Sequence, residues 1–217
     1  MARTQGDTAA RFIPPKASLP QLKEIARGCT ACDLYKRGTQ TVFGAGAKHA
    51  RVVFVGEQPG NEEDLKGEPF VGPAGKLLDK ALVAAGIERK ETYVTNIVKH
   101  FKWEPRGKRR IHKKPNALEI AACKPWFEAE VARLKPDVVV CLGATAAQAL
   151  LGRTFKVTQQ RGQPITNSSY APTVIATVHP SSILRAPDDD ARHEEMRKFI
   201  DDLKIVARFI HKQRRAA

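Results

Sequence analysis

Hydrophobic residues fall along this chain in two alternating patterns. Short continuous apolar runs rich in β-branched residues predict strands that are buried on both faces. Between these runs, apolar residues recur at helical spacing and predict amphipathic helices. Strands are expected at 52–55, 93–95, 137–142 and 173–177, and helices at 19–27, 73–85, 115–134, 144–151 and 192–210. This alternation predicts an α/β fold with a central, mostly parallel four-stranded sheet that helices cover on both faces.

The segments outside these elements lack a clear period and are expected to be irregular. Residues 61–67 and 102–114 are predicted to be charged loops, and 152–171 a loop with room for a hairpin. The chain is expected to divide into a flexible leader at 1–17, one domain at 18–210 that includes the basic loop 102–114, and a basic tail at 211–217.

Polar side chains follow the predicted strands at the points where the strands end. Glu57 and Gln58 come after the first strand, Asn96 after the second, and His179 and Ser181 after the fourth. Parallel strands end at the same edge of a sheet, and ligands of open α/β sheets bind at that edge. We therefore expect these five side chains to meet in one site.

Composition and charge narrow the class of partner. The chain has 217 residues, of which 42% are hydrophobic, so it can bury one core and form one domain. Its net charge of +14 is large for this size, and cations cluster at 108–114, which indicates nucleic acid as the partner. No apolar run could span a bilayer, and the first residues carry no signal-peptide core. We expect a cytoplasmic monomer with no membrane partner.

Several motifs together resemble those of one enzyme family, the iron–sulfur uracil-DNA glycosylases. They are GEQPG at 56–60, EPFVG at 68–72, VTN at 94–96 and HPSS at 179–182. The resemblance extends from about Cys29 to Arg185 and implies the three-layer α/β/α sandwich of that superfamily. The segment GKRRIHK at 107–113 resembles the extra loop of one subgroup, UdgX, whose members become covalently attached to uracil-DNA through a histidine in that loop.

The resemblance implies a role for each side chain that would touch uracil. Excision breaks the bond between the base and the sugar C1′ after the base has been turned out of the stack into a pocket. Phe70 is placed to stack on the base, and the Asn96 amide offers both a donor and an acceptor to its edge. His179 is expected to stabilise the negative charge that grows on the leaving uracil. Gln58 is expected to line the same pocket.

Glu57 and His112 are the residues expected to act at the sugar. Glu57 can stabilise positive charge at C1′ or deprotonate a nucleophile, and His112 is predicted to take the place of water as that nucleophile. The cations that flank His112 are expected to lower its pKa and keep it neutral. The residues predicted to hold the DNA are Lys108, Arg109, Arg110, Lys113, Ser181, Ser182 and Arg185.

The cysteines indicate a metal site more than disulfides, because two of them form a Cys-x-x-Cys pair. Cys29, Cys32 and Cys123 are the expected ligands, whereas Cys141 lies in a buried strand, where free cysteine is a common small hydrophobic residue. Related glycosylases have a cysteine ligand where this chain has His100, so the resemblance implies Cys29, Cys32, His100 and Cys123 around a [4Fe–4S] cluster. Zinc would accept the same ligands.

Three functions are compatible with the sequence. The favoured one is a uracil-DNA glycosylase that excises uracil and is then trapped on C1′ through His112. The alternatives are a multiple-turnover glycosylase, in which Glu57 activates water, and a non-catalytic iron–sulfur protein that binds DNA. Uracil-containing DNA is the expected partner, single-stranded in preference, with double-stranded DNA also possible.

Overall fold

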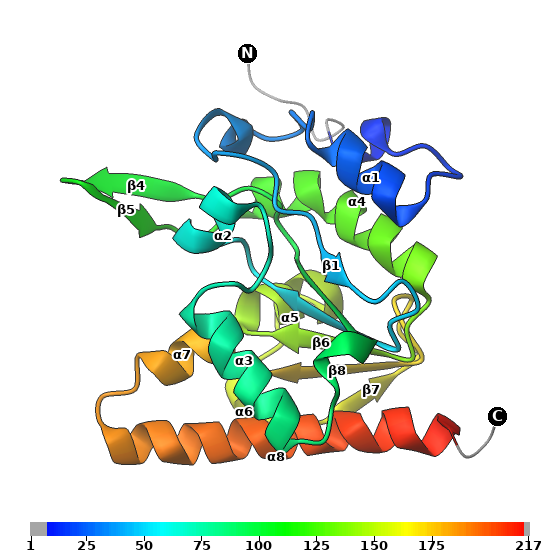
Figure 1. Ribbon diagram of the computed structural model, residues 1–217, viewed down its shortest axis with the longest axis vertical. Coiled ribbons are helices and arrows are strands. Elements are labelled where there is room, and N and C mark those ends of the chain that lie inside the picture. The colour runs from blue at the N-terminus through cyan, green and yellow to red at the C-terminus, as the bar shows by residue number, and fades with distance from the viewer. Residues whose placement is uncertain (1–7, 215–217) are drawn as a thin grey trace.

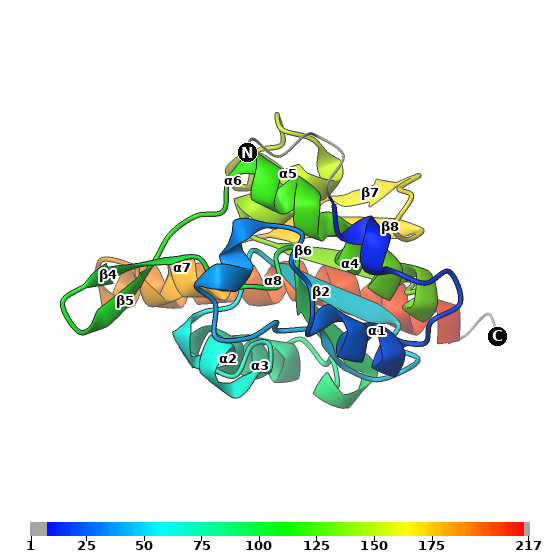
Figure 2. The same ribbon diagram turned by 90° about the horizontal axis from the view of Figure 1, so that it is seen from above.

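The computed structural model describes residues 8–214, with side chains up to residue 210. It has three layers, with helices on both faces of a central sheet (Figures 1 and 2). The sheet has six strands in the order β1 (Ala45–Gly46), β3 (Thr92–Asn96), β2 (Val52–Gly56), β6 (Val138–Leu142), β8 (Thr173–Thr177) and β7 (Pro164–Thr166). The four central strands are parallel, whereas β1 and β7 run antiparallel at the two edges.

The four predicted strands and the mostly parallel α/β fold are confirmed, and the sheet has two more strands than expected. All residues of β2 and β6 are buried, as the continuous apolar runs predict for strands covered on both faces. The added strands β1 and β7 are only two and three residues long. Strands of that length are too short to show a period in sequence.

Each face of the sheet has its own hydrophobic core. On one face, Val53 and Val55 of β2 pack with Trp126; on the other, Val52 and Phe54 pack with residues of α3 and α8. The first face is covered mainly by α1 (Leu19–Ala26), α4 (Ala117–Leu134) and α5 (Ala144–Leu151). The second is covered by α3 (Pro73–Ala84) and α8 (Asp189–Arg214). The shorter helices are η1 (Ala9–Phe12), η2 (Asp33–Lys36), α2 (Asn61–Lys66), η3 (Arg89–Glu91), α6 (Val157–Gln160) and α7 (Pro180–Leu184).

Three segments predicted to be loops contain regular structure. One of them, 152–171, holds α6 and β7, and β7 pairs antiparallel with β8. Residues 61–66 form α2, because Glu63 accepts the backbone N–H of Gly60 at its start and Gly67, with φ of 74°, ends it. Residues 103–112 form a hairpin of β4 (Trp103–Arg106) and β5 (Arg109–His112), with Gly107 at φ 58° in the turn. The prediction of an irregular basic loop at 102–114 was therefore wrong. Dense charge and Pro105 hide the strand period in this segment.

The ends of the chain differ from the predicted boundaries. Part of the expected leader is packed onto the domain, because Ala9 in η1 is fully buried and η1 lies against α4. Helix α8 extends to Arg214 and so includes the first residues of the predicted tail. Residues 1–7 and 215–217 of the predicted leader and tail lie outside the described residues.

The β4–β5 hairpin projects from the body of the molecule on the side where α7 lies (Figure 1). It therefore stands beside the edge at which the parallel strands end. Among the helices of residues 8–214, none combines the length and the apolar run needed to cross a membrane.

Candidate functional site

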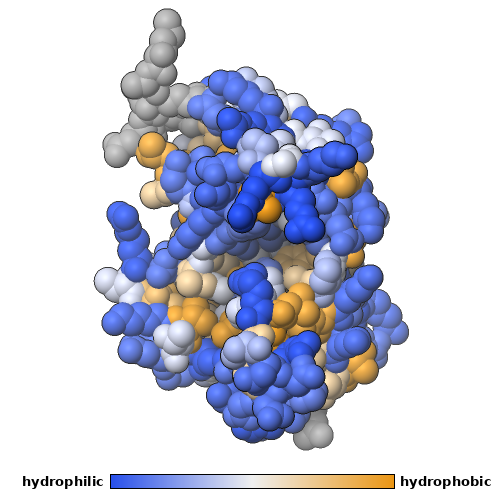
Figure 3. Space-filling model, turned by 90° about the vertical axis from the view of Figure 1, so that its left-hand side faces the viewer, coloured by the Kyte–Doolittle hydropathy of each residue, from blue (hydrophilic) through white to orange (hydrophobic). Residues whose placement is uncertain are grey.

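A cavity of about 810 Å³ opens at the carboxyl ends of the parallel strands. Figure 3 shows this face of the molecule, which is hollowed and exposes hydrophobic residues between hydrophilic ones. The structure brings most of the predicted site residues together there. The lining includes Glu57, Gln58, Phe70, Asn96, His112, His179, Ser181 and Arg185.

Gly56, at the end of β2, leaves the space in which three side chains converge. A Cβ atom at this position would lie 2.4 Å from Asn96 Oδ1, 2.9 Å from Phe70 Cζ and 3.5 Å from His179 Nε2. Asn96 is almost fully buried, and the rings of Phe70 and His179 have centroids 6.0 Å apart. The absence of a side chain at Gly56 therefore creates a narrow recess bounded by an amide, an aromatic ring and an imidazole.

Phe70 adopts an unusual backbone conformation. Its φ of 57° lies in the left-handed region, which costs energy for a bulky residue and is found mainly at functional sites. Gly75 allows this turn, since a Cβ there would lie 1.7 Å from the carbonyl oxygen of Phe70. The chain holds the Phe70 ring in the cavity wall at a conformational cost.

His179 is held as a neutral imidazole with a defined tautomer. Its Nδ1 accepts the backbone N–H of Ser181 at 3.2 Å and lies 2.8 Å from the Ser181 hydroxyl. Because Nδ1 accepts, the ring proton is on Nε2, the atom that faces the recess at Gly56. Burial, with smaller contributions from Arg185 and His112, lowers the pKa of His179 to about 4. The site therefore offers one neutral N–H donor.

Glu57 lies between two side chains from distant parts of the chain. The Thr145 hydroxyl, in the first turn of α5, donates a hydrogen bond to its Oε2. The other oxygen, Oε1, lies 3.4 Å from His112 Nε2. The His112 side chain is 49% exposed, so it combines contact with Glu57 and access from solvent. A carboxylate that a hydroxyl orients beside an imidazole is able to accept the proton of that imidazole.

The pKa of His112 is lowered, as predicted, but for a different reason. Burial is the largest cause, Glu57 opposes it by favouring the charged ring, and Arg185 disfavours that form. The sequence predicts that neighbouring cations of the hairpin, such as Lys108 and Arg109, cause this effect. These residues are exposed in and beside the hairpin turn, where water screens their charge.

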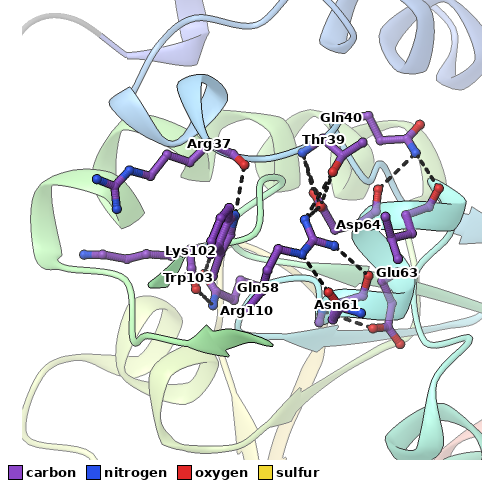
Figure 4. Close-up of polar contacts among 12 residues, drawn as sticks. Arg37, Thr39, Gln40, Gln58, Asn61, Glu63, Asp64, Lys102, Trp103 and Arg110 are labelled. Carbon is purple, nitrogen blue, oxygen red and sulfur yellow. Dashed lines mark hydrogen bonds and ion pairs between the residues drawn. The ribbon is translucent and has the colours of Figure 1, made fainter. Parts of the chain in front are cut away.

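Gln58 does not present its amide to the recess. Its Nε2 donates to the carbonyl oxygens of Lys102 (3.2 Å) and Lys113 (3.0 Å), and its Oε1 accepts the N–H of Lys102 (3.0 Å; Figure 4). Gln58 lines the cavity, as expected, and its amide also bridges the two strands at the base of the hairpin. Gln58 positions the strand that ends at His112.

Arg110, predicted to contact DNA, is committed to the protein. Its Nη1 pairs with the fully buried Asp64 at 2.6 Å, and its Nε donates to Asn61 Oδ1 at 2.7 Å (Figure 4). The other predicted DNA contacts are more accessible. Lys108, Arg109, Lys113 and Ser182 are exposed, although Lys113 pairs with Glu104 and the Ser182 hydroxyl donates to the His179 carbonyl.

The predicted metal ligands are all buried, on the side of the sheet that carries α1 and α4. Cys29 Sγ accepts the indole N–H of Trp126, and Cys123 Sγ accepts the N–H of Lys99, both at 3.2 Å. Burial raises the pKa of Cys123, and the neighbouring Cys32 and Cys29 raise it further. Cys141 lies in β6 as expected of a core residue, and burial raises its pKa to about 12.

His100 has the properties of a metal ligand. Its Nδ1 is buried without a hydrogen-bond partner, and burial lowers the pKa of the ring to about 4, so the imidazole is neutral. Within residues 8–214, no three His, Cys, Asp or Glu side chains converge closely enough to hold a single metal ion. The orphaned nitrogen and the N–H···S contacts fit a metal centre.

Two residues in the cavity were missed in the sequence. Thr145 lies in a small-residue helix, and nothing local marks its contact with Glu57, 88 positions away. Glu63 lines the cavity with its carboxylate fixed by the N–H groups of Gly60 (3.1 Å) and Gly72 (2.7 Å). Its position three residues after Gly60, at a helix start, was the one available signal.

Comparisons with known proteins agree with this site. Residues 43–204 match the family model described as the uracil DNA glycosylase superfamily. The chain is similar to the type-4 uracil-DNA glycosylase of Thermotoga maritima, with 39% identity over 194 residues, which cover 88% of this chain and 94% of the relative. It is also similar to the type-4 uracil-DNA glycosylase of Archaeoglobus fulgidus, with 35% identity over 192 residues, covering 86% of this chain and 93% of the relative.

Proposed function

The chain belongs to the uracil DNA glycosylase superfamily, and from that premise we propose that it excises uracil from DNA and then becomes joined to the sugar through His112. Uracil-DNA glycosylase activity is what the family match and the relatives support. The trapping step of the UdgX subgroup is supported by one observation above all. His112 Nε2 lies 3.4 Å from Glu57 Oε1 in the wall of the same cavity that holds Phe70, Asn96 and His179.

The recess at Gly56 is suited to a flipped uracil. Phe70 stacks on the base, and base–aromatic stacking contributes about 1–3 kcal/mol. The buried Asn96 amide pairs with the edge of the base, where it offers a donor and an acceptor. His179 donates from Nε2 to the uracil carbonyl on which negative charge develops, so it stabilises the leaving group without transferring a proton.

The covalent step uses Glu57 as the base and His112 as the nucleophile. The bond between C1′ and uracil N1 breaks, and its electron pair leaves with the uracil anion. Glu57 Oε1 takes the proton from His112 Nε2, and the lone pair freed on that nitrogen forms the new bond to C1′. The products are a neutral glutamic acid, an N-alkylated imidazole and the uracil anion, so charge is conserved.

The DNA strand is held by the basic residues around the cavity. Lys108 and Arg109 in the hairpin are exposed and free to meet phosphates, and Arg185 lines the cavity itself. Such contacts carry no sequence information, which suits an enzyme that must find uracil in any context. Uracil-containing single-stranded DNA is the proposed substrate.

A [4Fe–4S] cluster is the proposed cofactor, held by Cys29, Cys32, His100 and Cys123. The type-4 relatives, the buried thiols and the orphaned His100 nitrogen support this set. The cluster would supply cross-links between the N-terminal segment, the segment after β3 and α4. Visible absorption and iron analysis of the purified protein test this assignment, and a zinc content of one per chain would overturn it.

The trapping step is tested with uracil-containing single-stranded DNA. The native protein is mixed with labelled DNA, heated in detergent and separated on a denaturing gel. We expect a slow band for the native protein and none for His112→Ala, which should release uracil and leave free abasic DNA. Release of many uracils per native chain without the slow band would instead establish a multiple-turnover glycosylase. Binding without uracil release would contradict both enzymatic functions.

A further inference from the structure

We propose that Trp103 is a positioning residue for the covalent step, because its indole N–H fastens the β4–β5 hairpin to the body of the protein. The inference rests on the proposed trapping function of His112. According to this proposal, trapping also depends on a residue outside the cavity, because Trp103 is not among the residues that line the cavity.

Trp103 is the cross-strand partner of His112. The two residues face each other in the antiparallel register of the hairpin, at the end nearest the body. Directly opposed residues of a strand pair have their Cβ atoms about 4.5–5.5 Å apart, so a displacement of one moves the other. Any contact that fixes Trp103 therefore also limits where His112 can lie.

The Trp103 side chain reaches out of the hairpin. Its Nε1 donates to the backbone carbonyl of Arg37 at 2.9 Å, a contact between residues 66 positions apart (Figure 4). A two-stranded hairpin is at best marginally stable alone, so external contacts of this kind determine its position. On the other strand, Arg110 makes the corresponding contact with Asp64.

The Trp103 ring also supports that second contact. The Arg110 guanidinium lies over it, 5.5 Å from the ring centroid, and over Phe101 at 5.4 Å. The ring thus has two separable functions. The stacking function requires only an aromatic ring, whereas the contact with Arg37 requires the indole N–H.

The segment that receives Trp103 is itself fixed to the body. Thr39 donates from its backbone N–H (2.9 Å) and from its hydroxyl (2.6 Å) to the Asp64 carboxylate, the same group that binds Arg110. Gly38 packs closely on His100, so that a Cβ there would lie 3.3 Å from His100 Cδ2. Residues 37–39, which we call the dock, are therefore held in place by the body of the protein. They contact both strands of the hairpin, through Trp103 on β4 and Arg110 on β5.

Two substitutions of Trp103 separate the hydrogen bond from the stacking contact. Trp103→Phe keeps an aromatic ring under Arg110 and deletes only the donor, and Trp103→Ala deletes both functions. Tyr35→Phe is the matched control, because it alters an exposed aromatic ring just before the dock. Urea unfolding of each variant separates a change in docking from a change in global stability.

Two readouts are compared under single-turnover conditions. The first is the ratio of covalent adduct to free abasic DNA, and the second is the rate of tryptic cleavage after Lys108 and Arg109 in the DNA-free protein. For Trp103→Phe we expect the ratio to fall and the cleavage rate to rise, each by about three- to tenfold, the equivalent of one hydrogen bond. Trp103→Ala should exceed these changes, and Tyr35→Phe should show neither.

The outcomes separate the two proposals. If the native protein traps DNA and Trp103→Phe matches it in both readouts, the role of Trp103 is overturned. If the native protein forms no adduct at all, the trapping function fails and with it the positioning role. The cleavage comparison would then still report whether Trp103 docks the hairpin.

Discussion

His112 Nε2 and Glu57 Oε1 lie 3.4 Å apart, although one residue is on the β4–β5 hairpin and the other follows β2. The second oxygen of Glu57 accepts a hydrogen bond from Thr145, so each oxygen has a separate partner. This division directs Oε1 at the imidazole. The contact that defines the proposed chemistry therefore depends on three segments that the fold brings together.

The hydroxyl of Thr145 is expected to control the rate of adduct formation. Thr145→Val keeps the shape of the side chain and removes the donor, which frees Glu57 to rotate away from His112. We expect the single-turnover rate constant at saturating DNA to fall by about tenfold or more, because a hydrogen bond to a charged group contributes about 1.5–3 kcal/mol. Thr145→Ser retains the hydroxyl and serves as the control. Equal rates for the valine and native proteins would show that Glu57 is oriented by other contacts.

The pH dependence of trapping should report the ionisation of His112. Attack requires the neutral ring, and the pKa of His112 is lowered, so the rate should be constant through neutral pH and fall only below the ordinary histidine value of about 6.5. Arg185 is one of the causes of the lowered pKa, and Glu57 opposes it. Arg185→Gln should therefore move the acid limb to higher pH when measured at saturating DNA. A limb that moves to lower pH would contradict this assignment.

The parts of the site that could be predicted are those fixed by local sequence and by the sheet. Glu57, Asn96 and His179 meet because each lies at the carboxyl end of a parallel strand, and those strands are recognisable as apolar runs. The sequence predicts that Gln58 and Arg110 touch uracil and DNA, but it gives no sign of the contacts that their polar groups make with other parts of the chain. A long polar side chain can reach many partners, and its choice depends on segments about 45–55 positions away, whose placement only the folded chain defines.

Gly56 is expected to be essential for uracil excision but not for folding. In Gly56→Ala the new methyl group would lie 2.4 Å from Asn96 Oδ1 and 2.9 Å from Phe70 Cζ, which displaces the groups that hold the base. Overpacking of this kind costs about 1–3 kcal/mol of stability, less than most domains possess. Uracil release should fall by about a hundredfold or more, a loss comparable to removal of a transition-state contact. Gly28→Ala is the control, because its Cβ would meet only the Ile25 carbonyl at an ordinary 3.7 Å. Near-native excision by Gly56→Ala would show that the base does not occupy this recess.

Lys99 is expected to have two roles. It should stabilise the fold by pairing with the buried Glu130, and it should position Asn96. Their side chains are 1% and 0% exposed, and Lys99 Nζ contacts Glu130 Oε2 at 2.7 Å, Thr95 Oγ1 at 2.6 Å and the Asn96 carbonyl at 2.9 Å. Lys99→Met leaves the carboxylate buried without its cation, so the free energy of unfolding should fall by about 3–5 kcal/mol in urea titrations.

The double variant Lys99→Met/Glu130→Gln separates the charge from the positioning of Asn96. A neutral amide oxygen can still accept the N–H of Gly44 and the hydroxyl of Tyr93, which both contact Glu130 Oε1. Because no charge is then buried alone, most of the lost stability should return. Uracil excision should be low in Lys99→Met and stay low in the double variant, because both lack the Lys99 ammonium group that donates to the backbone carbonyl of Asn96. Full recovery of excision together with stability would show that Lys99 only neutralises Glu130 and does not position Asn96.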